Sequence, residues 1–79
     1  MPILLKIKAG GRTETEEFAV TTERFLYILK GSLEVAIEME NKVLKTGENL
    51  YFDASRPHHF KNPTKHESWA LSVMTPTSL

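Results

Sequence analysis

The sequence contains no cysteine, which excludes disulfide bonds, thiolate metal sites and cysteine nucleophiles together. No apolar run approaches the roughly 18 residues that a membrane-spanning helix needs. Neither charge sign dominates, because ten Lys and Arg residues balance ten Asp and Glu residues. The chain therefore has no summed positive field that would attract nucleic acid or anionic lipid. We expect no direct nucleic-acid contact and no membrane contact.

The N-terminus has no basic segment ahead of its apolar patch and no small-residue cleavage site, so no secretory signal is predicted and a cytoplasmic location is expected. The chain also lacks a Gly-rich phosphate loop, and no Ser or Thr is seen next to His58 at nucleophile–base spacing. The 79 residues are 41% hydrophobic and 25% charged. We expect residues 1–79 to form one small globular domain, which a modest core or a dimer must stabilise.

What the chain does contain is a regular series of short periodic stretches. Turn-forming Gly, Pro, Asn and Thr separate them roughly every eight to twelve residues, which predicts an all-β sandwich or barrel. The clearest strand is "SLEVAIEME", residues 32–40, with one apolar and one mostly acidic face. The apolar face holds Leu33, Val35, Ile37 and Met39. A tight turn is expected at Glu40 and Asn41, with Val43 and Leu44 starting the return strand.

Further strands are predicted at residues 3–9, 17–20, 50–52, 58–61 and 68–74. The segment "TTERFLYILKG", residues 21–31, fits two structures. Its spacing allows a short helix capped by Thr22 and stopped by Gly31, whereas its β-branched and aromatic content favours a strand. We expect a strand, because a β neighbour lies on each side.

One constellation carries the most information. Gly47, Asp53, Ser55, His58 and Asn62 are spaced like the second motif of the cupin family, G-x5-P-x-G-x2-H-x3-N. Asp53 and Ser55 stand at the Pro and Gly positions of that motif. This resemblance implies a small antiparallel β-barrel of the jelly-roll type.

Two longer stretches add to the resemblance. "ERFLYILKGSLEV" resembles the end of the first cupin motif, and "LKTGENLYFDASRPHHFKNP" is similar to the sensor half of helix-turn-helix regulators that carry a C-terminal cupin domain. The resemblance runs from about residue 23 to residue 76 and is weaker through the first twenty residues.

The metal ligands of the family are mostly missing. Metal-dependent cupins use two His and one Glu of the first motif and one His of the second. The resemblance puts His58 at the second-motif ligand, Arg24 at the Glu position, and Val20 or Ala19 at the nearer His. No histidine precedes residue 58, and in an extended segment His58 and His59 point to opposite faces. We therefore expect no metal cofactor, with His58 as a weak candidate ligand for a divalent metal.

The resemblance also places Arg24 in the barrel interior near His58. The other side chains expected to line the same cavity are Leu26, Ile28, Phe52 and Phe60. The Arg guanidinium matches a carboxylate or phosphate with two parallel donors, and a partly protonated His58 would add a second positive contact. The hypothesis is a metal-free pocket for a small anionic ligand. The alternative is that Arg24 pairs with an acidic side chain at the barrel rim: Glu17, Glu23 or Glu48.

The outward side chains indicate a partner. If Leu26 and Ile28 face the interior, Phe25, Tyr27 and Leu29 face away from it and form an apolar patch, which favours a homodimer interface. Trp69 is expected in the core or in an interface.

The favoured function is a small-molecule-binding cupin domain without chemistry of its own. By resemblance it is the effector-sensing C-terminal part of a transcriptional regulator whose DNA-binding portion would precede Met1. One alternative is a stand-alone cupin enzyme of the metal-dependent dioxygenase or isomerase type, with His58 and Glu23 or Glu17 as ligands. Another is a structural or interaction barrel filled by its own side chains.

Overall fold

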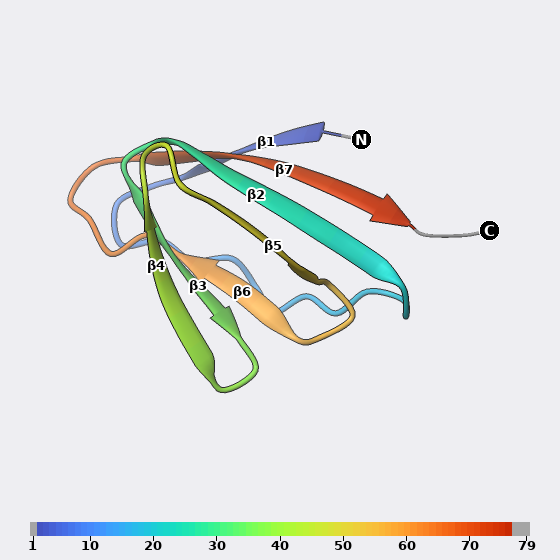
Figure 1. Ribbon diagram of the computed structural model, residues 1–79. Coiled ribbons are helices and arrows are strands. Elements are labelled where there is room, and N and C mark those ends of the chain that lie inside the picture. Colours follow the sequence, from blue (N-terminus) through green and yellow to red (C-terminus); the bar gives the residue numbers. More distant parts are fainter. Residues whose placement is uncertain (1, 77–79) are drawn as a thin grey trace.

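The computed structural model describes residues 2–76, which form seven β-strands and no helix. The strands are β1 (Pro2–Ile7), β2 (Thr22–Lys30), β3 (Ser32–Ile37), β4 (Glu40–Lys45), β5 (Asn49–Asp53), β6 (His58–Lys61) and β7 (Ser68–Pro76). They build two antiparallel sheets, in the orders β1-β7-β2-β5 and β4-β3-β6 (Figure 1). The all-β prediction is confirmed, as is the strand at residues 21–31. Among the described residues, no helix is long and apolar enough to cross a membrane.

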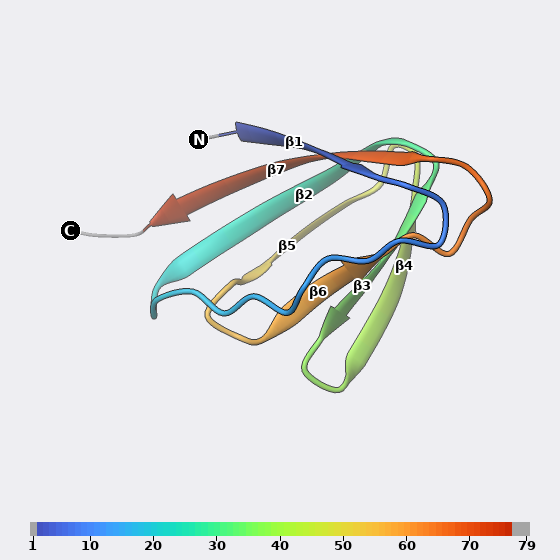
Figure 2. The same ribbon diagram turned by 180° about the vertical axis from the view of Figure 1, so that it is seen from behind.

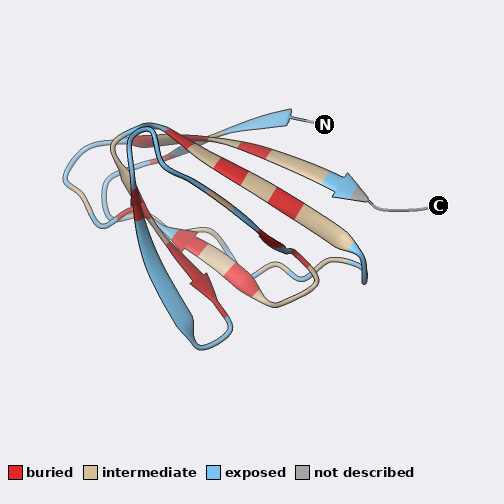
Figure 3. Cartoon of the chain, viewed as in Figure 1, coloured by how far each residue is buried: buried red, intermediate tan, exposed pale blue. Residues whose placement is uncertain are grey.

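Strand β2 shows the predicted alternation. Arg24, Leu26 and Ile28 are buried, whereas Phe25 and Tyr27 are half-buried on the opposite face (Figure 3). The two faces differ because successive side chains of a strand point to opposite sides of the sheet. The predicted facing of this strand is therefore confirmed.

Strand β7 places its small side chains inward. Ser68, Ala70 and Ser72 are buried, while Trp69 lies half-buried on the outer face with Lys6 Nζ 4.6 Å from the centre of one of its rings. The small inward side chains leave space for the longer ones of the neighbouring strand β2. Of the two positions expected for Trp69, the core is excluded because that face of β7 points out of the barrel, and the interface stays a prediction.

The core lies between the two sheets. Its largest fully buried side chains include Leu26 and Ile28 from β2, Leu33 and Val35 from β3, and Phe60 from β6. Burial of each such side chain contributes about 1.5–3 kcal/mol, so this contact holds the sheets together.

The β3–β4 hairpin turns earlier than predicted. Ile37 pairs with Glu40, so the turn consists of Glu38 and Met39, with a left-handed φ of 53° at Glu38. Met39 is 97% exposed and does not belong to the apolar face of the strand. The alternating pattern continues through Met39, but strand pairing stops before it.

The predicted strand at residues 17–20 is also wrong. Residues 11–18, here called the edge segment, run irregularly along the free edge of β6. Glu16 N donates to His58 O at 2.8 Å, His58 N donates to Glu16 O at 3.0 Å, and Thr13 N donates to Phe60 O at 2.9 Å. The segment satisfies the backbone groups of an edge strand without forming a regular ladder.

Gly31 joins the two sheets between β2 and β3. Its φ is 76°, and a Cβ atom there would lie 2.6 Å from Ser68 Oγ. Both the left-handed backbone and the contact require glycine. The stretch that resembles the end of the first cupin motif therefore contains a position, Gly31, at which only glycine fits.

Candidate functional site

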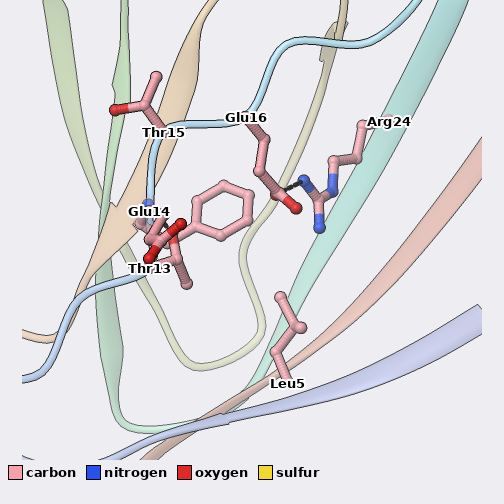
Figure 4. Close-up of a pocket in the computed structure, with 7 residues that line it drawn as sticks. Leu5, Thr13, Glu14, Thr15, Glu16 and Arg24 are labelled. Carbon is pink, nitrogen blue, oxygen red and sulfur yellow. Dashed lines mark hydrogen bonds and ion pairs between the residues drawn. The ribbon is translucent and has the colours of Figure 1, made fainter.

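The inward face of β2 carries a buried cation. Arg24 is 3% exposed and donates three hydrogen bonds. Its Nε donates to Ser72 Oγ at 2.7 Å, and its Nη1 donates to Glu16 Oε1 at 2.7 Å and to His58 Nε2 at 2.9 Å. These partners come from β7, the edge segment and β6, so the guanidinium connects three parts of the barrel. Figure 4 shows Glu16 and Arg24 pointing toward each other.

The hydrogen bonds fix the tautomer of His58. An Arg guanidinium has no acceptor atom, so His58 Nε2 accepts, and Nδ1 carries the proton and donates to Arg56 O at 2.8 Å. Burial lowers the pKa of His58, and the charge of Arg24 lowers it further, against the raising effects of the Arg56 carbonyl and Glu16. His58 is therefore a neutral imidazole, and the second positive contact expected from it is not available.

The pairing partner of Arg24 was missed by the sequence reasoning. Glu23, one of the predicted rim partners, accepts a hydrogen bond from Tyr51 instead, and Glu48 accepts one from Lys45 N at 2.8 Å. Glu16 lies in the irregular edge segment, where no period-2 pattern shows which side chains point inward. Glu16 lies eight residues before Arg24, and no sequence pattern between the two indicates that their side chains pair.

A cavity of about 200 Å³ opens beside Arg24, between β1 and the edge segment. Its lining consists of Leu5, Thr13, Glu14, Thr15, Glu16, Arg24 and Phe60 (Figure 4). Of the six predicted site residues, Arg24 and Phe60 line this cavity. The other four, Leu26, Ile28, Phe52 and His58, are buried near them but are not among its lining residues.

One amino group of Arg24 has no partner within residues 2–76. Hydrogen bonds there use Nε and Nη1 but not Nη2. Arg24 is also one of the residues that line the cavity. The guanidinium therefore borders the cavity with an amino group that none of these hydrogen bonds uses.

A second cavity of about 340 Å³ continues along the same side of the barrel and shares Thr13 with the first. Three cations, Lys6, Lys8 and Arg12, line it together with Glu67. Such a cluster raises the local concentration of anions.

The site does not fit the metal that the family motif would hold. Both nitrogens of His58 are engaged, one by the Arg24 guanidinium and the other by Arg56 O. Within residues 2–76, no three His, Cys, Asp or Glu side chains are grouped as metal ligands. A transition metal needs three or four such ligands converging on one point, and a cation already stands beside His58.

The neutral His58 predicts a pH dependence of stability. Its pKa is lowered in the folded state, so as the pH falls below the unfolded value of about 6.5, the unfolded chain takes up a proton first. We expect the free energy of unfolding to fall with a slope of up to about 1.4 kcal/mol per pH unit until the folded pKa is reached. Urea titrations between pH 8 and pH 4 measure this slope. In His58→Gln, whose amide oxygen still accepts from Arg24, the slope should be smaller; an unchanged slope would show that His58 is not its source.

The two packed antiparallel sheets, closed at one edge by residues 11–18, define a small jelly-roll barrel with a polar site at its open side. The chain belongs to the cupin family: the family described as "Cupin domain" matches residues 3–74. No protein with a curated description matches the sequence.

Solved structures with the same fold include two regulators and an enzyme. The cupin domain of an XRE family transcriptional regulator from Enterobacter cloacae has a TM-score of 0.88 at 18% identity, covering 92% of this chain and 77% of the other. An HTH_3 family transcriptional regulator from Vibrio cholerae has a TM-score of 0.85 at 15% identity, covering 94% and 41%. A sugar phosphate isomerase of the cupin superfamily from Silicibacter pomeroyi has a TM-score of 0.81 at 20% identity, covering 96% and 50%. The chain spans half or less of the last two proteins.

Proposed function

We propose that this chain is a metal-free, small-molecule-binding cupin domain that serves as the effector-sensing part of a transcriptional regulator. The observation that carries the proposal is the buried guanidinium of Arg24, which lines a small cavity and uses only Nε and Nη1 for its hydrogen bonds to the described residues. A buried charge needs compensation, and Glu16 supplies part of it. The remaining donor fits an anionic group of a ligand.

The ligand is a small carboxylate or phosphate. The cavity of about 200 Å³ is smaller than the 300–1,000 Å³ of pockets for drug-sized ligands. The basic residues Lys8 and Arg12 line the neighbouring cavity and would draw anions toward it.

Glu16 acts as a resident competitor of the ligand. Its carboxylate occupies Nη1 of Arg24, yet its side chain is 42% exposed, so it can turn into solvent when another anion compensates the charge of Arg24. An incoming anion would replace this carboxylate and bind Nη1 and Nη2 together, as a bidentate Arg contact does. The edge segment would then lose one of its attachments to β2, which couples ligand binding to a local change of the barrel.

The regulator role is supported by the likeness to the cupin domain of the Enterobacter regulator and to the Vibrio regulator. A sensing domain acts by binding its ligand better in one arrangement than in another. The two arrangements here are the barrel with Glu16 bound to Arg24 and the barrel with Glu16 released, and the anionic ligand binds the second one better.

Anion binding is the test. Differential scanning fluorimetry and calorimetry with acetate, a panel of small mono- and dicarboxylates and inorganic phosphate should stabilise the wild type. Glu16→Gln should bind the same anion about fivefold more tightly for each 1 kcal/mol of competition removed, and Arg24→Met should lose binding. Glu17→Gln, next to Glu16 but outside the cavity lining, is the matched control and should behave as the wild type.

If no anion stabilises either the wild type or Glu16→Gln, the ligand-binding proposal is overturned and a barrel filled by its own side chains is left. Equal affinity of Glu16→Gln and the wild type would overturn the role of Glu16 as competitor.

A further inference from the structure

The two cavities lie along one side of the barrel and form a single groove. Each is lined by residues of β1 on one side and of the edge segment on the other, and Thr13 lines both of them. Figure 2 shows how this arrangement arises, because the chain turns back after β1 and returns along β6 as the edge segment. We call the two cavities together the edge groove. Their volumes of about 200 and 340 Å³ leave room for a ligand longer than the anionic group that Arg24 would hold.

The end of the edge groove away from Arg24 carries two further cations, Lys8 and Arg12. They stand on the two sides of a turn, which Gly11 N closes by donating to Lys8 O at 2.8 Å. Asn62 Nδ2 donates to the same carbonyl at 3.2 Å. These bonds fix the backbone of the turn, so both cations are held at this end of the groove.

The charges of Lys8 and Arg12 are not compensated by the described part of the chain. No ion pair found there includes either side chain, and the residue bridged to Arg12 is Lys61, another cation. The acid that lines this end, Glu67, accepts a hydrogen bond from Trp69 Nε1 at 2.8 Å. Like charges on neighbouring strands destabilise each other, so an anion bound at this end would be favourable.

The middle of the edge groove is lined by apolar side chains from both sides, Leu5 and Ile7 from β1 and Phe60 from β6. Leu5 lines the first cavity and Lys8 the second. Three residues of extended chain span on the order of 10 Å. A ligand that reaches both ends would therefore carry two anionic groups on the order of 10 Å apart, joined by an apolar linker.

We propose that the edge groove binds an elongated dianion, with one anionic group on Arg24 and the other on Lys8 and Arg12. The simplest molecule of this class is a linear α,ω-dicarboxylate. The proposal rests on the proposed function, because it takes the anion contact of Arg24 as given, and it adds the class of ligand. A monoanion leaves Lys8 and Arg12 without a partner, and a short dianion does not reach both ends. The distance between the two anionic groups thus determines which ligand binds best.

Calorimetric titration of the wild type with octanoate and suberate tests the second anion contact. The two acids have chains of the same length and differ in the group at the far end. Suberate should bind about two- to thirtyfold more tightly, the gain expected from two exposed ion pairs. Succinate should show no such gain over butyrate, because it is too short to span the groove. Equal affinity for octanoate and suberate, or an equal gain for succinate, would overturn the elongated-dianion proposal alone.

Charge-neutralising variants locate the second contact. Lys8→Gln combined with Arg12→Gln should remove the gain of suberate and leave the affinity for octanoate unchanged. Lys42→Gln combined with Lys45→Gln, on β4 and outside both cavities, removes the same net charge and should behave as the wild type. Loss of the gain in both double variants would make it an effect of overall charge and overturn the proposal. If neither acid binds to the wild type, the proposed function itself is overturned as well.

Discussion

Replacement of Asn62 by alanine should lower the free energy of unfolding by about 3–5 kcal/mol, because several buried polar groups would lose their partner together. The Asn62 side chain is fully buried. Its Nδ2 donates to Ile7 O at 2.8 Å, Lys8 O at 3.2 Å and His66 O at 2.7 Å. Its Oδ1 accepts from Thr64 N at 2.9 Å and from Thr64 Oγ1 at 2.7 Å. Alanine would remove all five contacts, although Lys8 O would keep the bond from Gly11 N and His66 O would keep the bond from Thr64 Oγ1, each at 2.8 Å.

The size of this loss follows from where Asn62 lies. Asn62 lies in the loop that leads into β7, and its side chain bonds to the end of β1. The contact with Ile7 joins residues more than fifty positions apart in the sequence. Each unsatisfied buried group costs about 1–3 kcal/mol, and the costs do not add fully because the loop can relax. Since a domain of 79 residues is expected to have a free energy of unfolding of roughly 4–12 kcal/mol, the substitution should remove a large share of it.

Urea unfolding followed by tryptophan fluorescence measures the effect, since Trp69 lies on β7 directly after this loop. Asn41→Ala removes an exposed asparagine from β4 and should change the free energy of unfolding by less than about 0.5 kcal/mol. Equal stability of Asn62→Ala and Asn41→Ala would show that water replaces the lost hydrogen bonds and that Asn62 does not hold the loop.

The fold could be predicted where a local pattern coincided with strand pairing. On β2, the alternation of Arg24, Leu26 and Ile28 with Phe25 and Tyr27 matches the two faces of the sheet. At the β3–β4 hairpin the alternation did not predict the end of the strand, because Met39 continues the alternation but lies in the turn. Periodicity shows which side chains share a face, but it does not show where pairing ends.

The candidate site could be predicted in part. The resemblance led to the expectation that Arg24 lies near His58, and the two side chains are hydrogen-bonded in the structure. The role of Glu16 could not be predicted, because its segment follows the edge of β6 without a regular period. The neutral state of His58 could not be predicted either, since it depends on which of its ring nitrogens faces a donor.

Replacement of Arg24 by alanine should destabilise the domain by about 3–5 kcal/mol, the range for removing one partner of a buried charged network. It would leave His58 Nε2 and Ser72 Oγ without their donor and open a cavity where the side chain was. Arg24→Met fills most of that volume, and Glu16 is free to turn into solvent. We therefore expect Arg24→Met to cost about 1–3 kcal/mol, mainly from the unpaired His58 nitrogen.

A second substitution should remove that remaining cost. The ring of His58 lies among three phenylalanines, with ring centres 5.9 Å from Phe18, 5.0 Å from Phe52 and 5.8 Å from Phe60. His58→Phe combined with Arg24→Met would replace the polar pair by apolar side chains in an aromatic environment, an exchange that is often neutral or stabilising. We expect the double variant to be within about 1 kcal/mol of the wild type, whereas the two single variants together lose more.

Thermal and urea unfolding of the wild type, both single variants and the double variant form a complete cycle. For a domain of this size, each 1 kcal/mol corresponds to a shift in Tm of about 4–8 °C, so the predicted non-additivity is measurable. Additive losses would mean that Arg24 and His58 stabilise the barrel independently. Recovery in the double variant, together with loss of anion binding, would mean that the barrel does not need the buried charge for its stability and that Arg24 serves the cavity.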